Sequence, residues 1–154
     1  MRVSDILAAG GLIIQPSWVT FDDAVDGLVA SLVHNGQLPA TLAGAAVRAV
    51  RERERVANTA IVEIGVSIPH ARLDGVCGVV AAIAGSPTAV YYHMERVPIT
   101  LMVLVLSAPD RAGEHLNFLS KMSMLLQSES LRYALRHAPD HGTALAALRA
   151  QPGG

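Results

Sequence analysis

ITLMVLVLS, residues 99–107, is the longest of three apolar runs at the centre of the chain. The others, IVEIGVSI at 61–68 and GVVAAIAG at 78–85, are also short and rich in β-branched side chains, and each run is bounded by glycine or proline. Such runs are typical of strands in a sheet that is covered on both faces. The centre of the chain therefore predicts a β-sheet packed between other elements.

Amphipathic helices are predicted on both sides of this central block. Residues 20–36 (TFDDAVDGLVASLVHNG) place apolar side chains at three- and four-residue spacing. Thr20 and Asp23 are spaced as a capping box at the start of this helix, and Asn35-Gly36 supplies a stop at its end. Further helices are expected over residues 40–55, 115–126, 128–137 and 140–150.

The order of helices, then strands, then helices predicts an α/β fold in which a mixed β-sheet is covered by helices. A mixed sheet is expected because the connections vary too much in length for a regular βαβ series. LIIQPSW at 12–18 predicts an extended segment that breaks at Pro16, and AVYYH at 89–93 predicts a short strand. The length fits a single domain, which we assign to residues 1–150, followed by a C-terminal tail at 151–154.

The composition is that of a folded protein without a general basic surface. Apolar residues make up 51% of the chain and charged residues 16%, and 12 basic against 13 acidic side chains give a net charge of −1. Binding to nucleic acid or to a membrane surface normally needs a basic excess on one face. No nucleic-acid partner is therefore expected, and contact with a membrane is peripheral at most. One local basic cluster occurs, at Arg48, Arg51, Arg53 and Arg55.

Three features bear on the cellular compartment. The uncharged run at 75–94 is long enough to cross a membrane, but GSPT at 85–88 interrupts it and it contains His93. Two short strands around a turn explain this run better than one spanning helix. The single cysteine, Cys77, excludes an internal disulfide and is expected to be a small buried hydrophobe. Since the N-terminus also lacks the pattern of a secretory signal, we predict a cytoplasmic protein.

Two of the six histidines are candidates for chemistry. His70 follows an apolar run that ends in Ile68-Pro69, and the proline stiffens the backbone that leads to the imidazole. Ends of strands are where α/β sheets usually present ligand-binding groups. His115 falls in the first turn of its predicted helix, where backbone N–H groups favour an anion, and on the inward face. Two imidazoles converging there would suit a phosphoryl group on one of them, because neutral imidazole is a nucleophile.

The residues alone also allow an ordinary structural role for His70, as a half-buried side chain with its hydrogen bonds satisfied. His34, His137 and His141 are expected to be surface or capping residues, and His93 is left unassigned. The spacing of cysteine and histidine is not that of a zinc site, and no metal site is predicted. The chain also lacks a glycine-rich phosphate loop and a Gly-x-Ser-x-Gly elbow.

Two motifs resemble a known family. VSIPHAR at 66–72 resembles the active-site signature of the fructose/mannitol-type enzyme IIA domain of the bacterial phosphoenolpyruvate:sugar phosphotransferase system, a family that includes the nitrogen-regulatory enzyme IIA proteins. EHLNFLSKMSMLL at 114–126 is similar to the second motif of that family, in the same order and at about the same spacing. The resemblance covers nearly the whole chain. It implies the enzyme IIA fructose/mannitol-like sandwich and the activity of a phosphocarrier.

The resemblance also implies roles for three residues. His70 would accept a phosphoryl group from the phosphohistidine of HPr or an HPr paralogue. His115 would hydrogen-bond the phosphoryl group or the active imidazole. Arg53 would stabilise the phosphoryl oxygens with its planar guanidinium; Arg55 is the alternative, and a solvated helix end is the ordinary explanation of both. The acceptor would be a sugar-permease enzyme IIB component or a regulated protein, and no metal or organic cofactor is implied.

The alternative function within the same family is a regulatory protein-binding module of the nitrogen-regulatory type, with weak or lost phosphotransfer. Family members usually carry a glycine-rich loop before Ile-Pro-His, whereas residues 58–65 here read NTAIVEIG. Bulkier residues make this loop stiffer, and Glu63 adds a negative charge near the site. For the contact with the donor we expect an apolar ring that includes Ala71 and Leu73, with residues 107–113 at its rim.

Overall fold

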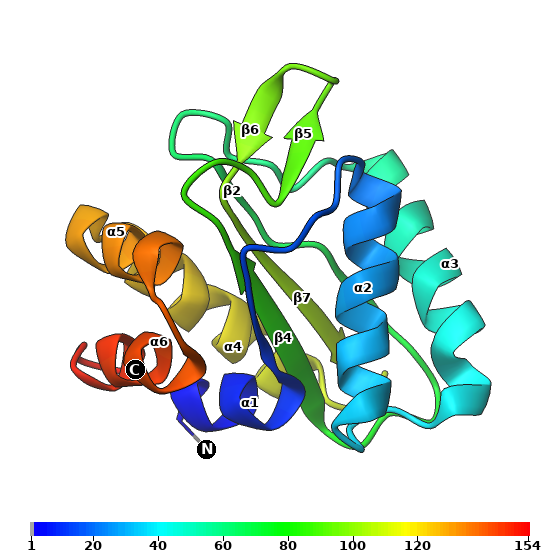
Figure 1. Cartoon of the computed structure of the whole chain (residues 1–154). Coiled ribbons are helices and arrows are strands. Elements are labelled where there is room, and N and C mark those ends of the chain that lie inside the picture. The colour runs from blue at the N-terminus through cyan, green and yellow to red at the C-terminus, as the bar shows by residue number, and fades with distance from the viewer. Residues whose placement is uncertain (1) are drawn as a thin grey trace.

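A computed structural model describes residues 2–154 and shows a central sheet between two groups of helices (Figure 1). The helices are α1 (Val3–Gly10), α2 (Phe21–His34), the 3₁₀ helix η1 (Ala40–Leu42), α3 (Ala43–Val56), α4 (Ala112–Leu125), α5 (Glu129–His137) and α6 (His141–Arg149). The strands are β1 (Leu12–Ile14), β2 (Val66–Ser67), β3 (His70–Arg72), β4 (Val79–Gly85), β5 (Tyr91–His93), β6 (Val97–Ile99) and β7 (Leu101–Ser107).

The main sheet is mixed, as the sequence predicts. Its strand order is β1-β4-β7-β2, and β3 also pairs with β7. The central strands β4 and β7 are antiparallel, β1 joins β4 in parallel, and both β2 and β3 join β7 in parallel. Strands β5 and β6 form a separate antiparallel hairpin at the top of Figure 1. The predicted fold class, a mixed sheet covered by helices, is confirmed.

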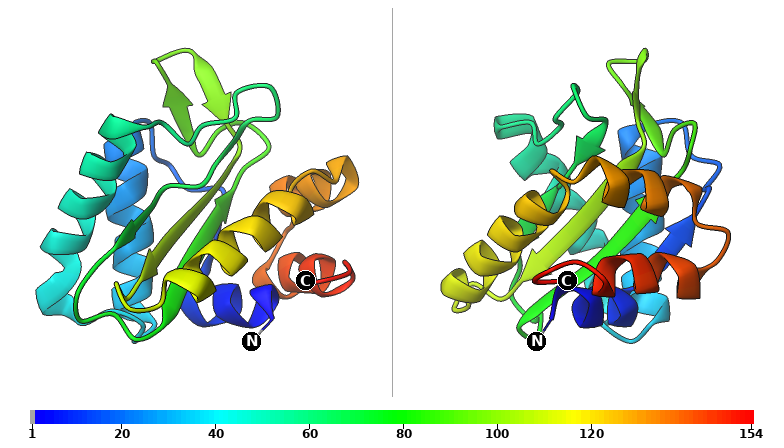
Figure 2. Two further views of the ribbon diagram at one scale, coloured as in Figure 1. Left: turned by 180° about the vertical axis from the view of Figure 1, so that it is seen from behind. Right: turned by 90° about the vertical axis from the view of Figure 1, so that its left-hand side faces the viewer.

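Both faces of the sheet are covered. Helices α2 and α3 lie on one face, and α1, α4, α5 and α6 lie on the other (Figure 2). The side chains of β7 alternate between the two cores, as a strand period of two requires. Leu101, Val103 and Val105 pack toward the group of α4, and Met102, Leu104 and Leu106 pack toward α2 and α3. This double burial explains why the run at 99–107 is apolar throughout.

Beside β7, the edge of the sheet consists of two short strands in place of one long strand. Ile68 and Pro69 separate β2 from β3, and the Pro69 carbonyl still accepts the Val105 N–H at 3.0 Å. The alternation of side chains continues through this break, because Ile68 packs toward the α4 side and Ala71 toward α2 and α3. His70 therefore projects on the face covered by α4.

The predicted helices are confirmed, with small shifts at their ends. At the start of α2, the Thr20 hydroxyl accepts the Asp23 N–H at 3.0 Å, and the Asp23 carboxylate accepts the Thr20 N–H at 3.4 Å. The predicted capping box is therefore present. Helix α1 is an element that the sequence analysis did not predict.

The strand expected at 61–68 is wrong over most of its length. Only its last residues form β2, and residues 62–65 form a turn closed by hydrogen bonds between Ile61 and Val66 of 2.7 and 3.3 Å. Gly65 adopts a φ of +65°, and a Cβ at this position would lie 3.1 Å from Thr100 Oγ1. The turn therefore depends on glycine, although its other residues favour a strand.

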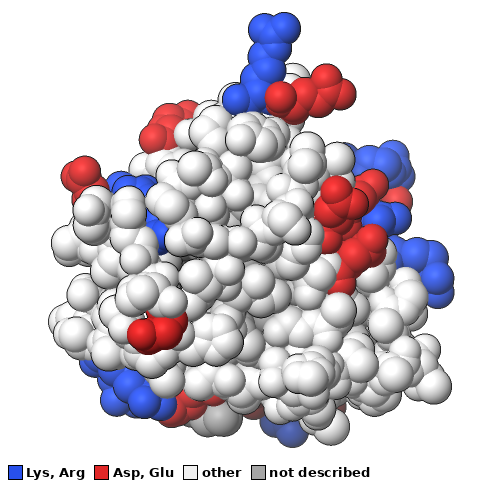
Figure 3. Space-filling view, in the orientation of Figure 1, with Lys and Arg blue, Asp and Glu red and all other residues white. Residues whose placement is uncertain are grey.

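Cys77 is exposed, so the prediction of a buried cysteine was wrong. It lies in the connection between β3 and β4, just before the first strand residue, where the chain has not yet entered the core. The uncharged run at 75–94 contains β4 and β5, as predicted. Within residues 2–154, no helix has both the length and the apolar character needed to cross a bilayer. On the face shown in Figure 3, charged side chains lie mainly at the margins.

The two ends of the described chain lie side by side. The Gly154 carbonyl oxygen accepts hydrogen bonds from Arg2 Nε at 3.0 Å and from Ser4 Oγ at 2.9 Å. Arg149, the last residue of α6, pairs with Asp5 of α1 at 3.6 Å. These contacts fix α1 against α6 on the same side of the sheet as α4.

Candidate active site

The structure brings His70 and His115 together at the interrupted edge of the sheet. His70 is the first residue of β3, and His115 lies in the first turns of α4. Their ring centroids are 5.3 Å apart, and the ring planes meet at 61°. His70 comes shortly after the end of β2, as predicted. It is also the first residue of a further strand, β3, which was not predicted.

The hydrogen bond of His70 defines its tautomer. Its Nδ1 lies 2.8 Å from the carbonyl oxygen of Ile68. A carbonyl oxygen can only accept, so Nδ1 carries the proton and donates it. In the neutral ring the lone pair is then on Nε2. Because Pro69 is the only residue between the two partners, the orientation of the ring is tied to a stiff piece of backbone.

The imidazole ring of His115 contacts the buried hydroxyl group of Ser107. Its side chain is 3% exposed, and its Nδ1 lies 2.5 Å from Oγ of Ser107, which is fully buried. Burial is the main cause that lowers the pKa of His115 to about 4, and the electrostatic effect of its neighbours, including Arg72 and Arg53, adds to it. The ring is therefore neutral at physiological pH and carries a single proton.

Two arginines contribute positive charge around the histidine pair. Arg53 lies in the last turn of α3 and donates from Nη1 to the Ala57 carbonyl at 3.0 Å. Arg72 is exposed and shares β3 with His70. Both lower the pKa of His115, and the effect of Arg72 is the larger of the two. A role for Arg53 was expected from the sequence, whereas none was expected for Arg72.

Two other arginines of the basic cluster, Arg51 and Arg55, are engaged with acidic partners. Arg55, the alternative to Arg53, is exposed and pairs with Glu52 at 2.7 Å. Arg51 pairs with Asp22 at 3.1 Å and with Asp26 at 3.5 Å, which ties α3 to α2. Much of the positive charge predicted for this helix is therefore balanced locally, and Arg53 is the member of the cluster that acts on the histidine pair.

Glu54 organises the loop that follows α3. Its side chain is buried, and its carboxylate accepts hydrogen bonds from the Thr59 N–H at 3.0 Å and from the Thr59 hydroxyl at 2.9 Å. Asn58 adds a local turn by accepting the Ala60 N–H at 2.7 Å. Glu63, the acidic residue of the altered loop, is exposed. The loop is thus anchored by a carboxylate from α3.

The comparison with known families agrees with this arrangement. Residues 6–151 match the family model described as "Phosphoenolpyruvate-dependent sugar phosphotransferase system, EIIA 2". The chain belongs to this family. It is therefore an enzyme IIA domain, a component of a phosphotransferase system.

The individual proteins to which this enzyme IIA domain is similar share 19–34% of their residues with it. A "PTS system fructose-specific EIIA component" of Haloferax volcanii is 34% identical over 100 residues, which is 64% of this chain and 64% of that protein, just under two thirds of its length. A crystal structure of the nitrogen regulatory protein IIA-Ntr from Neisseria meningitidis has a TM-score of 0.78 at 21% identity, covering 95% of this chain and 98% of that one. The Escherichia coli mannitol enzyme IIA, in its complex with phosphorylated enzyme IIB, has a TM-score of 0.72 at 19% identity, covering 94% and 96%. The structural likenesses support the predicted enzyme IIA sandwich.

Three other histidines, His34, His137 and His141, lie at the surface, as predicted. His34 is exposed in the last turn of α2, and His141 is exposed at the start of α6. His137 donates from Nδ1 to the Tyr133 carbonyl at 2.9 Å and stacks on that ring. Among residues 2–154, no three His, Cys, Asp or Glu side chains are grouped so that they could hold a metal ion.

The expected apolar ring around His70 needs correction. Ala71 is only 7% exposed and packs in the core with α2 and α3, because neighbouring residues of a strand point to opposite faces. It cannot belong to a surface ring. Leu73 is half-buried. The predicted rim at 107–113 is wrong at Ser107, which is fully buried against His115, whereas residues 109–111 are exposed.

Three residues of the site were not predicted from the sequence: Ser107, Arg72 and Glu54. Ser107 had a weak signal in the sequence, since Thr100 and Ser107 are the two polar residues of the otherwise apolar run at 99–107. Arg72 lies within the VSIPHAR motif, two residues from His70, and the alternation of a strand places both on one face. For Glu54 no signal was available, because its partner Thr59 lies beyond the end of the helix.

Proposed function

We propose that this enzyme IIA domain, assigned to residues 1–150, is a phosphocarrier and that Nε2 of His70 is the phosphoryl acceptor. The hydrogen bond from His70 Nδ1 to the Ile68 carbonyl carries the proposal. It holds the proton on one nitrogen and directs the free lone pair to the other, beside a second imidazole and two arginines.

The proposed step is an in-line transfer from the phosphohistidine of HPr or an HPr paralogue. The lone pair of Nε2 forms the new nitrogen–phosphorus bond, and the bond to the donor imidazole breaks, with its electron pair staying on that imidazole. The Nδ1 proton of His70 stays in its hydrogen bond to the Ile68 carbonyl, so no proton has to leave the ring. Positioning and charge stabilisation account for the catalysis, and no cofactor takes part.

The neighbours of His70 would stabilise the phosphoryl group. If the Ser107 hydroxyl donates to Nδ1 of His115, the proton of this neutral ring lies on Nε2, where it can donate to a phosphoryl oxygen. Arg53 and Arg72 would supply positive charge to the same oxygens, and a planar guanidinium suits two of them at once.

Two kinds of acceptor fit the proposal. The mannitol enzyme IIA to which this chain is similar in fold was solved in a complex with phosphorylated enzyme IIB. We therefore propose an enzyme IIB component of a sugar permease as the acceptor, with a regulated protein that senses the phosphorylated state as the alternative. A chain with a single cysteine fits the reducing cytoplasm, which is the proposed location.

Incubation with phosphoenolpyruvate, enzyme I and HPr tests the acceptor residue. Intact mass spectrometry should detect one added phosphoryl group that acid removes, and the variant His70→Gln should acquire none. The matched control is His141→Gln, which changes an exposed histidine and should be phosphorylated like the wild type. Far-UV circular dichroism shows that each variant is folded.

The same phosphorylated domain separates the two acceptors. Rapid loss of the phosphoryl group to an added enzyme IIB component supports transport. A phosphoryl group that persists in the presence of enzyme IIB components supports regulation. If the wild type gains no phosphoryl group from HPr or its paralogues, the phosphocarrier proposal is overturned.

A further inference from the structure

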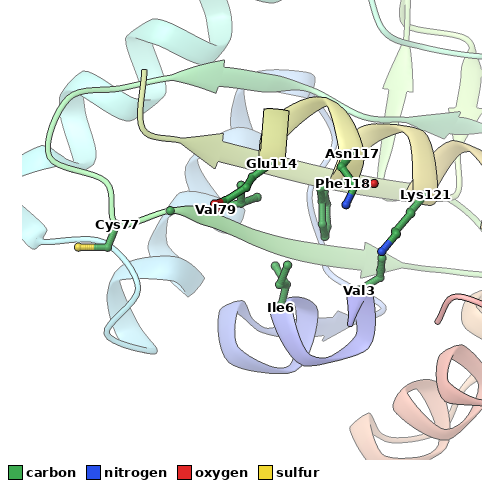
Figure 4. Close-up of a pocket in the computed structure, with 9 residues that line it drawn as sticks. Val3, Ile6, Cys77, Val79, Glu114, Asn117, Phe118 and Lys121 are labelled. Carbon is green, nitrogen blue, oxygen red and sulfur yellow. The ribbon is translucent and has the colours of Figure 1, made fainter. Parts of the chain in front are cut away.

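A pocket separate from the histidine pair lies between α1, α4 and the start of β4 (Figure 4). It has a volume of about 450 Å³, within the range of small-molecule sites. Val3 and Ile6 rise into it from α1, and Phe118 points into it from α4 (Figure 4). Together with Val79, these side chains give the pocket an apolar wall.

Lys121 gives this apolar pocket an unbalanced positive charge. It is the only lysine of the chain, and its side chain is half-buried and reaches from α4 toward Val3 (Figure 4). Among residues 2–154, no carboxylate oxygen lies within 4.0 Å of its ammonium group. A cation beside apolar surface is partly desolvated, so an anionic partner would stabilise it more than at an exposed position.

The acidic group at the other end of the pocket is already neutralised. Glu114 accepts a hydrogen bond from Arg111 at 3.1 Å. Asn117 lies between Glu114 and Lys121 on α4 and offers an amide donor on the same side (Figure 4). Cys77 also borders the pocket, but its sulfur points away from it (Figure 4). The charge that the pocket presents to a ligand is therefore that of Lys121.

We infer that this pocket binds a small monocarboxylic acid with an apolar body. The carboxylate would lie against the Lys121 ammonium group, with the Asn117 amide as a second donor, and the body would cover Phe118, Ile6 and Val79. A phosphate fits less well, because a doubly charged group needs more donors than one lysine and one amide supply. A neutral apolar molecule would leave Lys121 without a partner.

The pocket and the histidine pair share α4, on which Glu114 and His115 are adjacent residues. The bound acid would contact α4 through its carboxylate and α1 through its apolar body, and a change in the position of α4 would move His115. That consequence rests on the proposed function, whereas binding itself does not require phosphorylation and can be measured without it.

Titration of the unphosphorylated ¹⁵N-labelled domain with hexanoate tests the inference. Backbone signals of α1, of α4 and of residues 77–79 should shift and saturate. Lys121→Gln should weaken binding by about tenfold or more, the usual effect of removing one charge-assisted hydrogen bond. Arg96→Gln is the matched control: it removes an exposed cation from the β5–β6 hairpin and should leave binding unchanged.

Two analogues of the same length make the test specific. 1-Hexanol has the apolar body without the charge and should bind about tenfold more weakly than hexanoate. Hexylamine should also bind more weakly, because it would meet Lys121 with a like charge. The inference is overturned if millimolar hexanoate shifts none of these signals, if Lys121→Gln binds it as the wild type does, or if hexylamine binds more tightly than hexanoate.

Discussion

The two sides of strand β7 differ in how far the pairing extends and in what the neighbouring strands expose. Toward β4 it pairs through seven consecutive residues, and β7 itself is buried throughout. On the other side it pairs with β2 over two residues and with β3 over three, and Ile68 and Pro69 interrupt the edge. That edge carries the half-buried His70 and the exposed Arg72. The central pair of strands forms the buried core of the sheet. The interrupted edge has fewer paired residues and presents polar side chains between α3 and α4.

The comparison predicts that substitutions in the central strands mainly affect stability. Leu104 in β7 is fully buried and faces α2 and α3. Leu104→Ala should lower the free energy of unfolding by about 2–5 kcal/mol, because it removes buried methyl groups and leaves a cavity. Urea denaturation followed by circular dichroism measures this loss. In conditions where the variant is fully folded, it should still accept a phosphoryl group from HPr. A loss of acceptance by the folded variant would contradict the separation of the two regions.

At the interrupted edge, His115 should make stability depend on pH. The native ring stays neutral down to about pH 4, whereas the ring in the unfolded chain takes up a proton below about pH 6.5. Protonation therefore favours the unfolded state, and stability falls as the pH falls through this window. The shift of the pKa corresponds to about 3 kcal/mol by pH 4.

The variant His115→Gln isolates this effect. It keeps a polar group beside Ser107 but cannot titrate, so its stability should decline about 3 kcal/mol less than that of the wild type between neutral pH and pH 4. Urea denaturation at several pH values measures the difference, and the exposed His141→Gln serves as the control. Parallel pH profiles for wild type and His115→Gln would show that burial does not hold His115 neutral.

The same contrast explains what the sequence could predict. The apolar run of β7 and the capping box of α2 depend on neighbours in the sequence, so local patterns were sufficient. The turn at 62–65 was predicted to be a strand because Val62 and Ile64 are β-branched, and the neighbouring residues alone do not show that the chain turns at Gly65. The pairing of Ser107 with His115 joins a strand to a helix, and the exposure of Cys77 depends on the path between two strands. Such features follow from tertiary contacts, which are concentrated at the irregular edge.

Ser107 links the two regions, and its removal should have a moderate effect. Ser107→Ala leaves Nδ1 of the buried His115 without its partner, which should cost about 1–3 kcal/mol of stability. The ring ¹⁵N shifts of His115 should change as its tautomer is released, and phosphoryl acceptance should slow by about tenfold, as expected for the loss of one oriented donor. Rescue of the ring shifts by Ser107→Thr would identify the hydroxyl group as the cause.

Ser67→Ala is the matched control for this experiment. Ser67 is also fully buried in the same sheet. Its hydroxyl is near that of Tyr91, but among the described residues neither hydroxyl makes a hydrogen bond of acceptable geometry. Its removal should be neutral or slightly stabilising, because no bond is broken and a buried polar group is lost. Equal effects of the two substitutions would mean that the Ser107 hydroxyl does not orient His115.

Pro69→Ala should destabilise the fold less than Leu104→Ala or Ser107→Ala, although Pro69 interrupts the edge. Its carbonyl bond to the Val105 N–H can persist in Pro69→Ala, so the main loss is the restriction that proline places on the unfolded chain, about 0.4–1 kcal/mol. The hydrogen bond between His70 and Ile68 spans this residue, so the ring should become less ordered and phosphoryl acceptance slower. Pro98→Ala in β6 should not slow acceptance.

If Pro69→Ala instead loses as much stability as Leu104→Ala, then the edge supports the fold as much as the centre does. If it loses little stability and no rate, then His70 is oriented without the proline, and the interruption of the edge serves only to expose the ring.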